Sequence, residues 1–226
     1  MQRSDFGRQL GNWNIKENNN EDIQGPPFTH IIGSVFDVTS AYRFEINGVT
    51  MKFHPSTAFM TETRWALVSE EMKDTMANTT LPDFVVEVRP YGPGQTNQLD
   101  YLHRKMCQWM GTTDIQTQSG ILFDRLGNNV YLYCRNDLPN IQAQVDAQQA
   151  NLDRLPWQDY QHVYFQNLTP VGQIVYKGVQ ENYPNVSYIQ IPLNLEPTAK
   201  HGPNMIIHCI GAVNGLSLDL STIPLD

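Results

Sequence analysis

The sequence predicts an all-β protein, built as a single jelly-roll β-sandwich with long loops and one short helix. Three features predict this class: many short apolar runs of strand character, Gly, Pro or Asn at the ends of those runs, and long polar segments between them. A length of 226 residues suits one large β domain with a sizeable core. We expect an N-terminal arm over residues 1–27 and the jelly-roll domain over residues 28–226.

The N-terminal arm is predicted to be irregular. Residues 11–27 are rich in Asn, Gly and Pro and contain few apolar residues, of which Trp13 and Ile15 are the anchors. Residues 28–38 follow as a strand with apolar side chains on both faces, which fits a central strand of a sandwich.

The clearest local signal is a β-hairpin from Tyr42 to Phe53. Asn47-Gly48 is the dipeptide that most readily adopts the two positive φ angles of a type I′ turn. With this two-residue turn, apolar residues meet across the ladder: Ile46 with Val49, Phe44 with Met51 and Tyr42 with Phe53. The hairpin therefore has one apolar face, which another part of the chain must cover.

The next segment combines strands with the one expected helix. Residues 59–68 are predicted to be a strand, and the helix is expected at about residues 70–77. The hydroxyl of Ser69 can cap this helix, and the following pair of Glu residues suits the positive end of its dipole. Residues 83–91 contain strong β-formers and are predicted to be a strand.

The remainder is predicted to be mostly strands and loops. Residues 95–120 fit either a helix or a strand, and residues 136–156 are predicted to be a long surface loop that can include a helical turn. Further strands are expected at 130–134, 162–166, 171–177, 186–191 and 204–213.

Charge and cysteine usage exclude several classes of protein. The formal net charge is −8, and the 15 Lys and Arg residues are scattered, so any nucleic acid must be enclosed or contacted locally rather than held by a basic arm. The chain has no run of 18 apolar residues, so no membrane span is expected. Three widely spaced cysteines argue against a disulfide framework and for a reducing compartment.

No catalytic or phosphate-binding motif is present in the sequence, and the chain is therefore predicted not to be an enzyme. No cofactor is expected to be required, although oxygen ligands for Ca²⁺ could come from acidic residues of the arm and of the loop. These candidate metal ligands are Glu17, Glu21, Asp22, Asp146 and Asp153. Three tryptophans in loop-like context are candidates for stacking on nucleic-acid bases: Trp13, Trp109 and Trp157.

The stretch TRWALVSEEMKDTMANTTLPDFVVEVRPYGPGQTN resembles the capsid proteins of small icosahedral viruses, most closely those of parvoviruses of the densovirus kind. Trp65, residues 69–76 and residues 84–92 occupy the places of an aromatic-bearing strand, a short helix and a Val-rich strand in that family. The chain has no His-Asp pair of the kind found in the phospholipase site of longer parvovirus coat proteins.

The resemblance implies a structural capsid protein that assembles into a T=1 icosahedral shell of sixty copies around single-stranded DNA. It also implies a virion protein that is assembled inside the host cell, in the nucleus. The acidic candidate ligands named above leave Ca²⁺ at subunit interfaces as an option. Two alternatives stay open: a coat subunit of a picorna-like RNA virus, and a β-sandwich carbohydrate-binding module.

Overall fold

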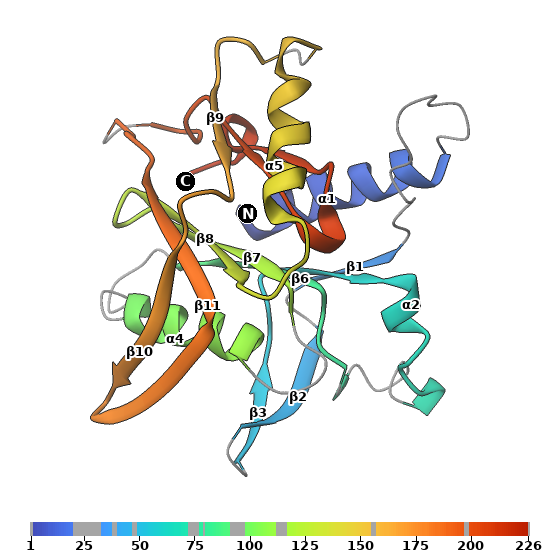
Figure 1. The fold of residues 1–226 in the computed structure, drawn as a ribbon, viewed down its shortest axis with the longest axis vertical. Coiled ribbons are helices and arrows are strands. Elements are labelled where there is room, and N and C mark those ends of the chain that lie inside the picture. Colours follow the sequence, from blue (N-terminus) through green and yellow to red (C-terminus); the bar gives the residue numbers. More distant parts are fainter. Residues whose placement is uncertain are drawn as a thin grey trace.

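A computed structural model shows an α/β molecule with helices on both faces of a central sheet (Figure 1). The structure describes residues 2–19, 33–37, 40–46, 49–71, 77–78, 80–90, 98–111, 117–154, 157–196 and 199–225. None of the described helices is long and apolar enough to span a membrane.

The central sheet has seven strands in the order β1-β4-β6-β7-β8-β11-β10. Within it, β6 and β7 run parallel, and every other neighbouring pair is antiparallel. The strands are β1 (Gly33–Asp37), β4 (Thr57–Thr61), β6 (Phe84–Val88), β7 (Ser119–Asp124), β8 (Asn129–Arg135), β10 (Thr169–Tyr176) and β11 (Val179–Pro192).

The prediction of a single all-β jelly roll is therefore wrong. A jelly roll packs two antiparallel sheets against each other, whereas this sheet is mixed and is covered by helices. The parallel step requires a crossover, and helix α4 (Gln98–Gly111) supplies it between β6 and β7. Residues 95–120, which the sequence left open between helix and strand, thus contain the helix that sets the topology.

One face of the sheet is covered by α4 and by a small second sheet (Figure 1). This sheet has the order β3-β2-β5, with β2 (Ala41–Ile46), β3 (Val49–Phe53) and β5 (Ala77–Asn78). The pairing of β2 with β3 confirms the predicted hairpin register, including Tyr42 opposite Phe53. The apolar face of the hairpin packs on Trp109 of α4, whose ring lies 5.5 Å from that of Tyr42 and 5.3 Å from that of Phe53.

The other face is covered by α1 (Gln2–Asn19) and by a three-stranded sheet of order β13-β12-β9. These strands are β9 (Gln161–Tyr164), β12 (Met205–His208) and β13 (Ser217–Asp219). The predicted irregular arm is a helix over most of its length, because Phe6, Leu10 and Trp13 fall on one side of it and are buried. The Trp13 ring packs edge-on against Phe59, with 5.6 Å between centroids.

Several shorter elements also differ from expectation. The predicted strand 59–68 divides into β4 and α2 (Glu62–Trp65), and the predicted loop 136–156 contains α5 (Ile141–Ala150) and η1 (Leu152–Arg154). Of the helix expected at about 70–77, residues 70–71 are helical, residues 72–76 lie outside the described residues, and β5 begins at residue 77. The remaining turns are η2 (Gly211–Val213) and η3 (Leu220–Thr222).

The three-stranded sheet contains an edge-to-edge pair of histidines. His162 Nδ1 and His208 Nε2 are 2.8 Å apart, and the ring planes differ by 13°. His208 is 3% exposed. Burial, and then the nearby His162, lower the pKa of His208 to about 4.

This pKa predicts that the protein loses stability when the pH falls below about 6.5. His208 stays neutral in the folded chain, whereas the unfolded chain takes up a proton near pH 6.5, so lowering the pH favours unfolding until the folded chain titrates near pH 4. We expect a loss of at most about 2 kcal/mol between pH 7 and pH 5, measured by urea unfolding. In His208→Gln this contribution should be missing, so the loss of stability between pH 7 and pH 5 should be smaller by up to about 2 kcal/mol. An unchanged pH profile would refute the assignment of the loss to His208.

Candidate functional site

The candidate site lies at the carboxyl ends of β6 and β7, the edge at which parallel strands of open sheets bind ligands. The sequence FVVEV forms β6 because β-branched and aromatic residues favour a strand. Along it the side chains alternate, so that Val85 faces α4 while Phe84 and Val86 face α1. Glu87 shares the face of Val85 and is a single carboxylate within an otherwise apolar strand.

Glu87 forms a buried ion pair with Lys105 of α4. Lys105 Nζ lies 2.7 Å from Glu87 Oε1, and the two side chains are 8% and 3% exposed. Lys105 Nζ also donates to the backbone carbonyl of His54 at 2.7 Å. Trp109 Nε1 donates to the same Glu87 Oε1 at 3.0 Å. Lys105 and Trp109 are four residues apart, so one face of α4 presents both to Glu87.

A second buried ion pair lies beside the first. Arg89 NH1 is 2.9 Å and 3.1 Å from the two carboxylate oxygens of Asp124, and the two side chains are 9% and 0% exposed. The backbone N–H of Gly127 donates to Asp124 Oδ1 at 3.0 Å, in the turn between β7 and β8. A Cβ on Gly127 would lie 2.3 Å from Asp124 Oδ2, so glycine allows this close approach. Asp124 is thereby fixed, and it holds Arg89 at the end of β6.

Burying two ion pairs is costly, because each charge loses its hydration and the mutual attraction only partly compensates. Apolar side chains of similar volume would serve stability at least as well. Buried charges that meet at the ligand-binding edge of a sheet are therefore candidates for function. The Glu87–Lys105 and Arg89–Asp124 pairs place two cations and two carboxylates at that edge.

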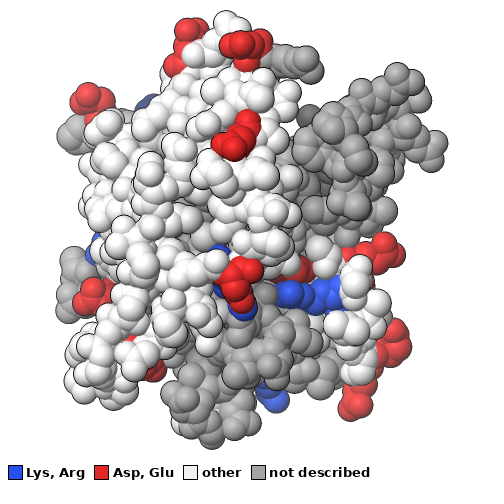
Figure 2. All heavy atoms as spheres, viewed as in Figure 1, with Lys and Arg blue, Asp and Glu red and all other residues white. Residues whose placement is uncertain are grey.

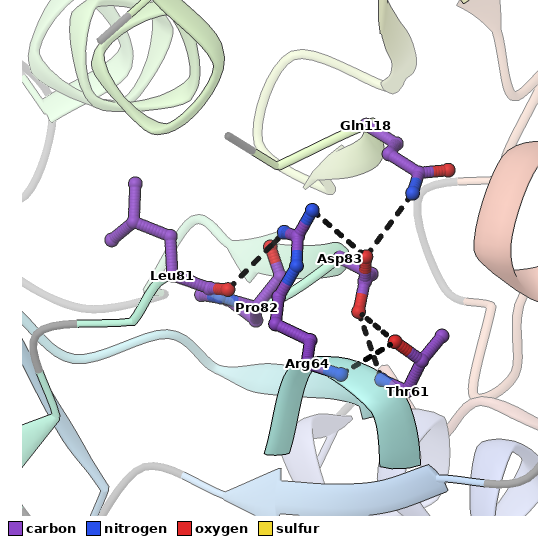
Figure 3. A network of polar contacts seen from close by, with 6 residues as sticks. All are labelled: Thr61, Arg64, Leu81, Pro82, Asp83 and Gln118. Carbon is purple, nitrogen blue, oxygen red and sulfur yellow. Dashed lines mark hydrogen bonds and ion pairs between the residues drawn. The ribbon is translucent and has the colours of Figure 1, made fainter. Parts of the chain in front are cut away.

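A third buried carboxylate, Asp83, serves structure at the opposite end of β6 (Figure 3). Asp83 Oδ2 accepts from the backbone N–H and the hydroxyl of Thr61, at 2.8 Å and 2.9 Å. Asp83 Oδ1 is 3.1 Å from both Arg64 NH2 and Gln118 Nε2. Since Thr61 caps α2 and Gln118 precedes β7, Asp83 joins three elements of the fold.

On the face of the molecule that Figure 2 shows, the Lys and Arg side chains form no continuous basic patch among the described residues. This agrees with the scattered basic residues of the sequence.

The cysteines contribute no nucleophile to the site. All three are free and buried in the structure. Burial raises the pKa of the Cys107 thiol, on α4, and raises that of Cys134 to about 12. Both thiols are therefore protonated at neutral pH and inert.

The acidic residues predicted as metal ligands do not lie at this site, as far as the structure describes them. Asp146 is exposed on α5 and accepts from Gln142 Nε2 at 2.7 Å, and Asp153 is exposed in η1. Glu17 belongs to α1, but its side chain, like Glu21 and Asp22, lies outside the described part of the chain. Among the described residues, no three His, Cys, Asp or Glu side chains gather to hold a metal. The Ca²⁺ ligands remain a prediction.

The three predicted stacking tryptophans belong to three different segments of the fold. Trp109 contacts Glu87 at the site and is fully buried. Trp13 is buried on α1, and Trp157 precedes β9 and uses its carbonyl to accept from His162 Nε2 at 2.9 Å. Base stacking by these residues remains a prediction. Sequence reasoning missed Glu87 and Lys105, although an isolated carboxylate within the apolar run FVVEV was a usable signal.

No family model and no curated protein match the chain. Among solved structures, it is similar to one described as the crystal structure of a putative nuclease belonging to DUF820 from Anabaena variabilis ATCC 29413. The two share 16% sequence identity over 59% of this chain and 63% of that chain, with a TM-score of 0.38. The match thus spans less than two thirds of that structure's length. Because the likeness is distant, we infer the function below from the geometry of the site alone.

The resemblance to parvovirus coat proteins is wrong, because the central sheet is mixed and covered by helices on both faces, whereas a jelly roll packs two antiparallel sheets together. The expectation that the chain is not an enzyme followed from the absence of a sequence motif. It is corrected, because the fold brings together buried charged residues that lie too far apart in the sequence to form one. The sixty-subunit shell, the enclosed single-stranded DNA, the interfacial Ca²⁺ and the virion or nuclear location remain untested predictions.

Proposed function

We propose that the chain is a divalent-cation-dependent hydrolase of phosphodiester bonds, with nucleic acid as its substrate. The observation that carries the proposal is the buried Glu87–Lys105 pair at the carboxyl end of the parallel β6–β7 step. A carboxylate and an ammonium side by side can serve the two needs of phosphoryl transfer: an oxygen ligand for a hard cation and a positive charge for the phosphate.

The carboxylates present fit Mg²⁺ or Mn²⁺ better than Ca²⁺. Mg²⁺ is usually held by one or two carboxylates together with substrate phosphate oxygens and water, whereas Ca²⁺ needs six to eight oxygens. Among the described residues, Lys105 and Trp109 both contact Glu87 at Oε1, so we assign Oε2 to the cation. A bound cation would polarise the phosphoryl oxygen and activate water for attack.

Lys105 and Arg89 stabilise the negative charge that develops on the phosphoryl oxygens. The Lys105 ammonium has three donors, of which one points to His54 and one to Glu87, so the third can reach a phosphate oxygen. Arg89 is oriented by Asp124 and adds a second positive charge at the same strand end. Water adds to phosphorus as the ester P–O bond breaks, and these two cations favour that transition state.

Cleavage assays with Mg²⁺ or Mn²⁺ test this function. Single-stranded DNA, duplex DNA, RNA and the small diester bis(p-nitrophenyl) phosphate are offered in turn. We expect cleavage that EDTA abolishes and that Glu87→Gln lowers at least about 100-fold. If the chain cleaved only the small diester, phosphodiester hydrolysis would be supported, but nucleic acid would be excluded as the substrate.

Glu181→Gln is the matched control. Glu181 also pairs with a basic residue of α4, Arg104, with 2.6 Å between Oε1 and NH2, but it lies on β11. Its replacement should leave the cleavage rate within about two-fold of wild type. No cation-dependent cleavage of any of the four substrates, or equal loss in both variants, would refute the proposal.

A further inference from the structure

The three-stranded sheet β13-β12-β9 covers the face of the central sheet that is opposite α4. In it, three polar side chains form a continuous hydrogen-bonded row. Ser217 Oγ lies 3.1 Å from His208 Nδ1, and His208 Nε2 lies 2.8 Å from His162 Nδ1. His162 Nε2 lies 2.9 Å from the backbone carbonyl of Trp157. The strand register produces the row, because His208 of β12 is paired directly with Ser217 of β13, and parallel β9 brings His162 beside them.

The direction of every hydrogen bond in this row follows from the group at its end, the Trp157 carbonyl. The Trp157 carbonyl can only accept, so His162 Nε2 carries a hydrogen and, in the neutral ring, His162 Nδ1 accepts. His208 therefore donates from Nε2, and its Nδ1 accepts the Ser217 hydroxyl. The near-coplanar rings, with 5.1 Å between centroids, fit an edge-to-edge N–H···N bond rather than a face-to-face stack. This is the arrangement of a nucleophile, a base and a group that fixes the base's tautomer.

The row ends in a pocket of about 150 Å³. One wall is the face of α5 that carries Gln144 and Gln148, and the other contains His208, Asn214 and Ser217. The Gln148 amide is fixed, since its Nε2 donates to the Cys209 carbonyl at 2.7 Å and to Asn214 Oδ1 at 3.1 Å.

Gln148 Oε1 is buried and has no hydrogen-bond partner among the described residues. A buried acceptor without a donor costs about 1–3 kcal/mol, and Gln148 is one of the residues that line the pocket. Structural packing of two histidines accounts for the pairing of the rings, but it accounts for neither this acceptor nor the pocket beside the serine hydroxyl.

We propose that Ser217, His208 and His162 form a second active site, which hydrolyses a small acyl ester bearing a hydrogen-bond donor. Ser217 Oγ bonds to the ester carbonyl carbon, and its proton passes to His208 Nδ1. The C–O bond to the leaving alcohol breaks, and the alcohol takes that proton from His208. Water then attacks the acyl-serine by the same route, which releases the carboxylic acid and restores the hydroxyl. His162 is a positioning residue, because it accepts from His208 Nε2 and keeps Nδ1 turned toward Ser217.

A fluorophosphonate probe tests the proposal on the wild-type chain, because it bonds to activated serines with loss of fluoride. We expect tandem mass spectrometry to place the label on Ser217. Hydrolysis of p-nitrophenyl acetate should fall at least about 100-fold in Ser217→Ala and in His208→Gln. Ser221→Ala is the matched control, since that hydroxyl donates to Asp219 Oδ1 and contacts no imidazole of the described residues, and it should keep wild-type labelling.

Two His162 variants separate positioning from mere packing. His162→Gln keeps an acceptor for His208 Nε2 and should retain most of the labelling, whereas His162→Leu should lower the labelling rate at least about ten-fold. A folded wild-type chain that takes no label on Ser217, or equal labelling in wild type and His162→Leu, would overturn the proposal. The wild-type result stands even where a variant fails to fold.

Discussion

Replacing Asp83 with alanine is expected to lower the free energy of unfolding by about 3–5 kcal/mol. The residue is 2% exposed, and its carboxylate receives contacts from Thr61, Arg64 and Gln118. The substitution removes the anion that the Arg64 guanidinium faces and deprives the partly buried donors of Thr61 and Gln118 of an acceptor. Urea unfolding followed by tryptophan fluorescence measures the change through the transition midpoint.

The control for Asp83 is Asp146→Ala on α5. Asp146 is exposed and accepts one hydrogen bond, from Gln142, so its loss should change stability by less than about 0.5 kcal/mol. An Asp83 variant that unfolds within 1 kcal/mol of wild type, on the order of a surface substitution, would mean that the network in Figure 3 does not hold α2 and β7 to β6.

Lys105→Met is expected to reduce phosphodiester cleavage at least about 100-fold and to cost about 3–5 kcal/mol of stability. The activity falls because the ammonium no longer faces the phosphate, and the stability falls because Glu87 stays buried without its cation. Activity is measured by initial rates with saturating Mg²⁺, and stability by urea unfolding.

The double variant Glu87→Gln with Lys105→Met separates the two effects. The Gln amide oxygen can still accept from Trp109 Nε1, and no charge remains buried, so stability should return to within about 1.5 kcal/mol of wild type. Activity should remain lost. A double variant as unstable as Lys105→Met alone would indicate that the ion pair serves the fold, and an active one would exclude the pair from the site.

Local features of the fold could be predicted from the sequence, whereas its topology could not. The hairpin register from Tyr42 to Phe53 was right because the turn dipeptide and the apolar alternation agree on one pairing. The jelly roll was wrong because the direction of β7 relative to β6 depends on what lies between them. That segment contains α4, whose buried Leu102, Met106 and Met110 have helical spacing.

Composition misled the prediction at the two other long helices. The arm was predicted to be irregular because its second half is rich in Asn. The apolar residues Phe6, Leu10 and Trp13, which pack α1 against the core, were given too little weight. In α5, Val145 is the one buried residue, so the segment shows no clear apolar stripe. Tertiary contacts rather than periodicity determine its placement, including the bond from Gln148 to the Cys209 carbonyl.

The candidate sites illustrate the same limit. Glu87 and Lys105 are 18 positions apart and meet through the α4 crossover, a distance at which no short motif exists. Ser217, His208 and His162 come from three strands and meet through the register of a small mixed sheet. In each site, one charged residue or histidine within an apolar strand is recognisable in the sequence. The residue that it contacts can be identified only from the folded structure.

The most direct test of the Glu87–Lys105 site is anomalous scattering from crystals soaked in Mn²⁺ together with a phosphorothioate oligonucleotide that resists cleavage. We predict a Mn²⁺ peak about 2.2 Å from a Glu87 carboxylate oxygen, in the range of hard-cation ligand distances, with a phosphate oxygen bound to both the ion and Lys105. Crystals that contain the oligonucleotide but show the Glu87–Lys105 pair intact and no Mn²⁺ beside it would contradict the proposal.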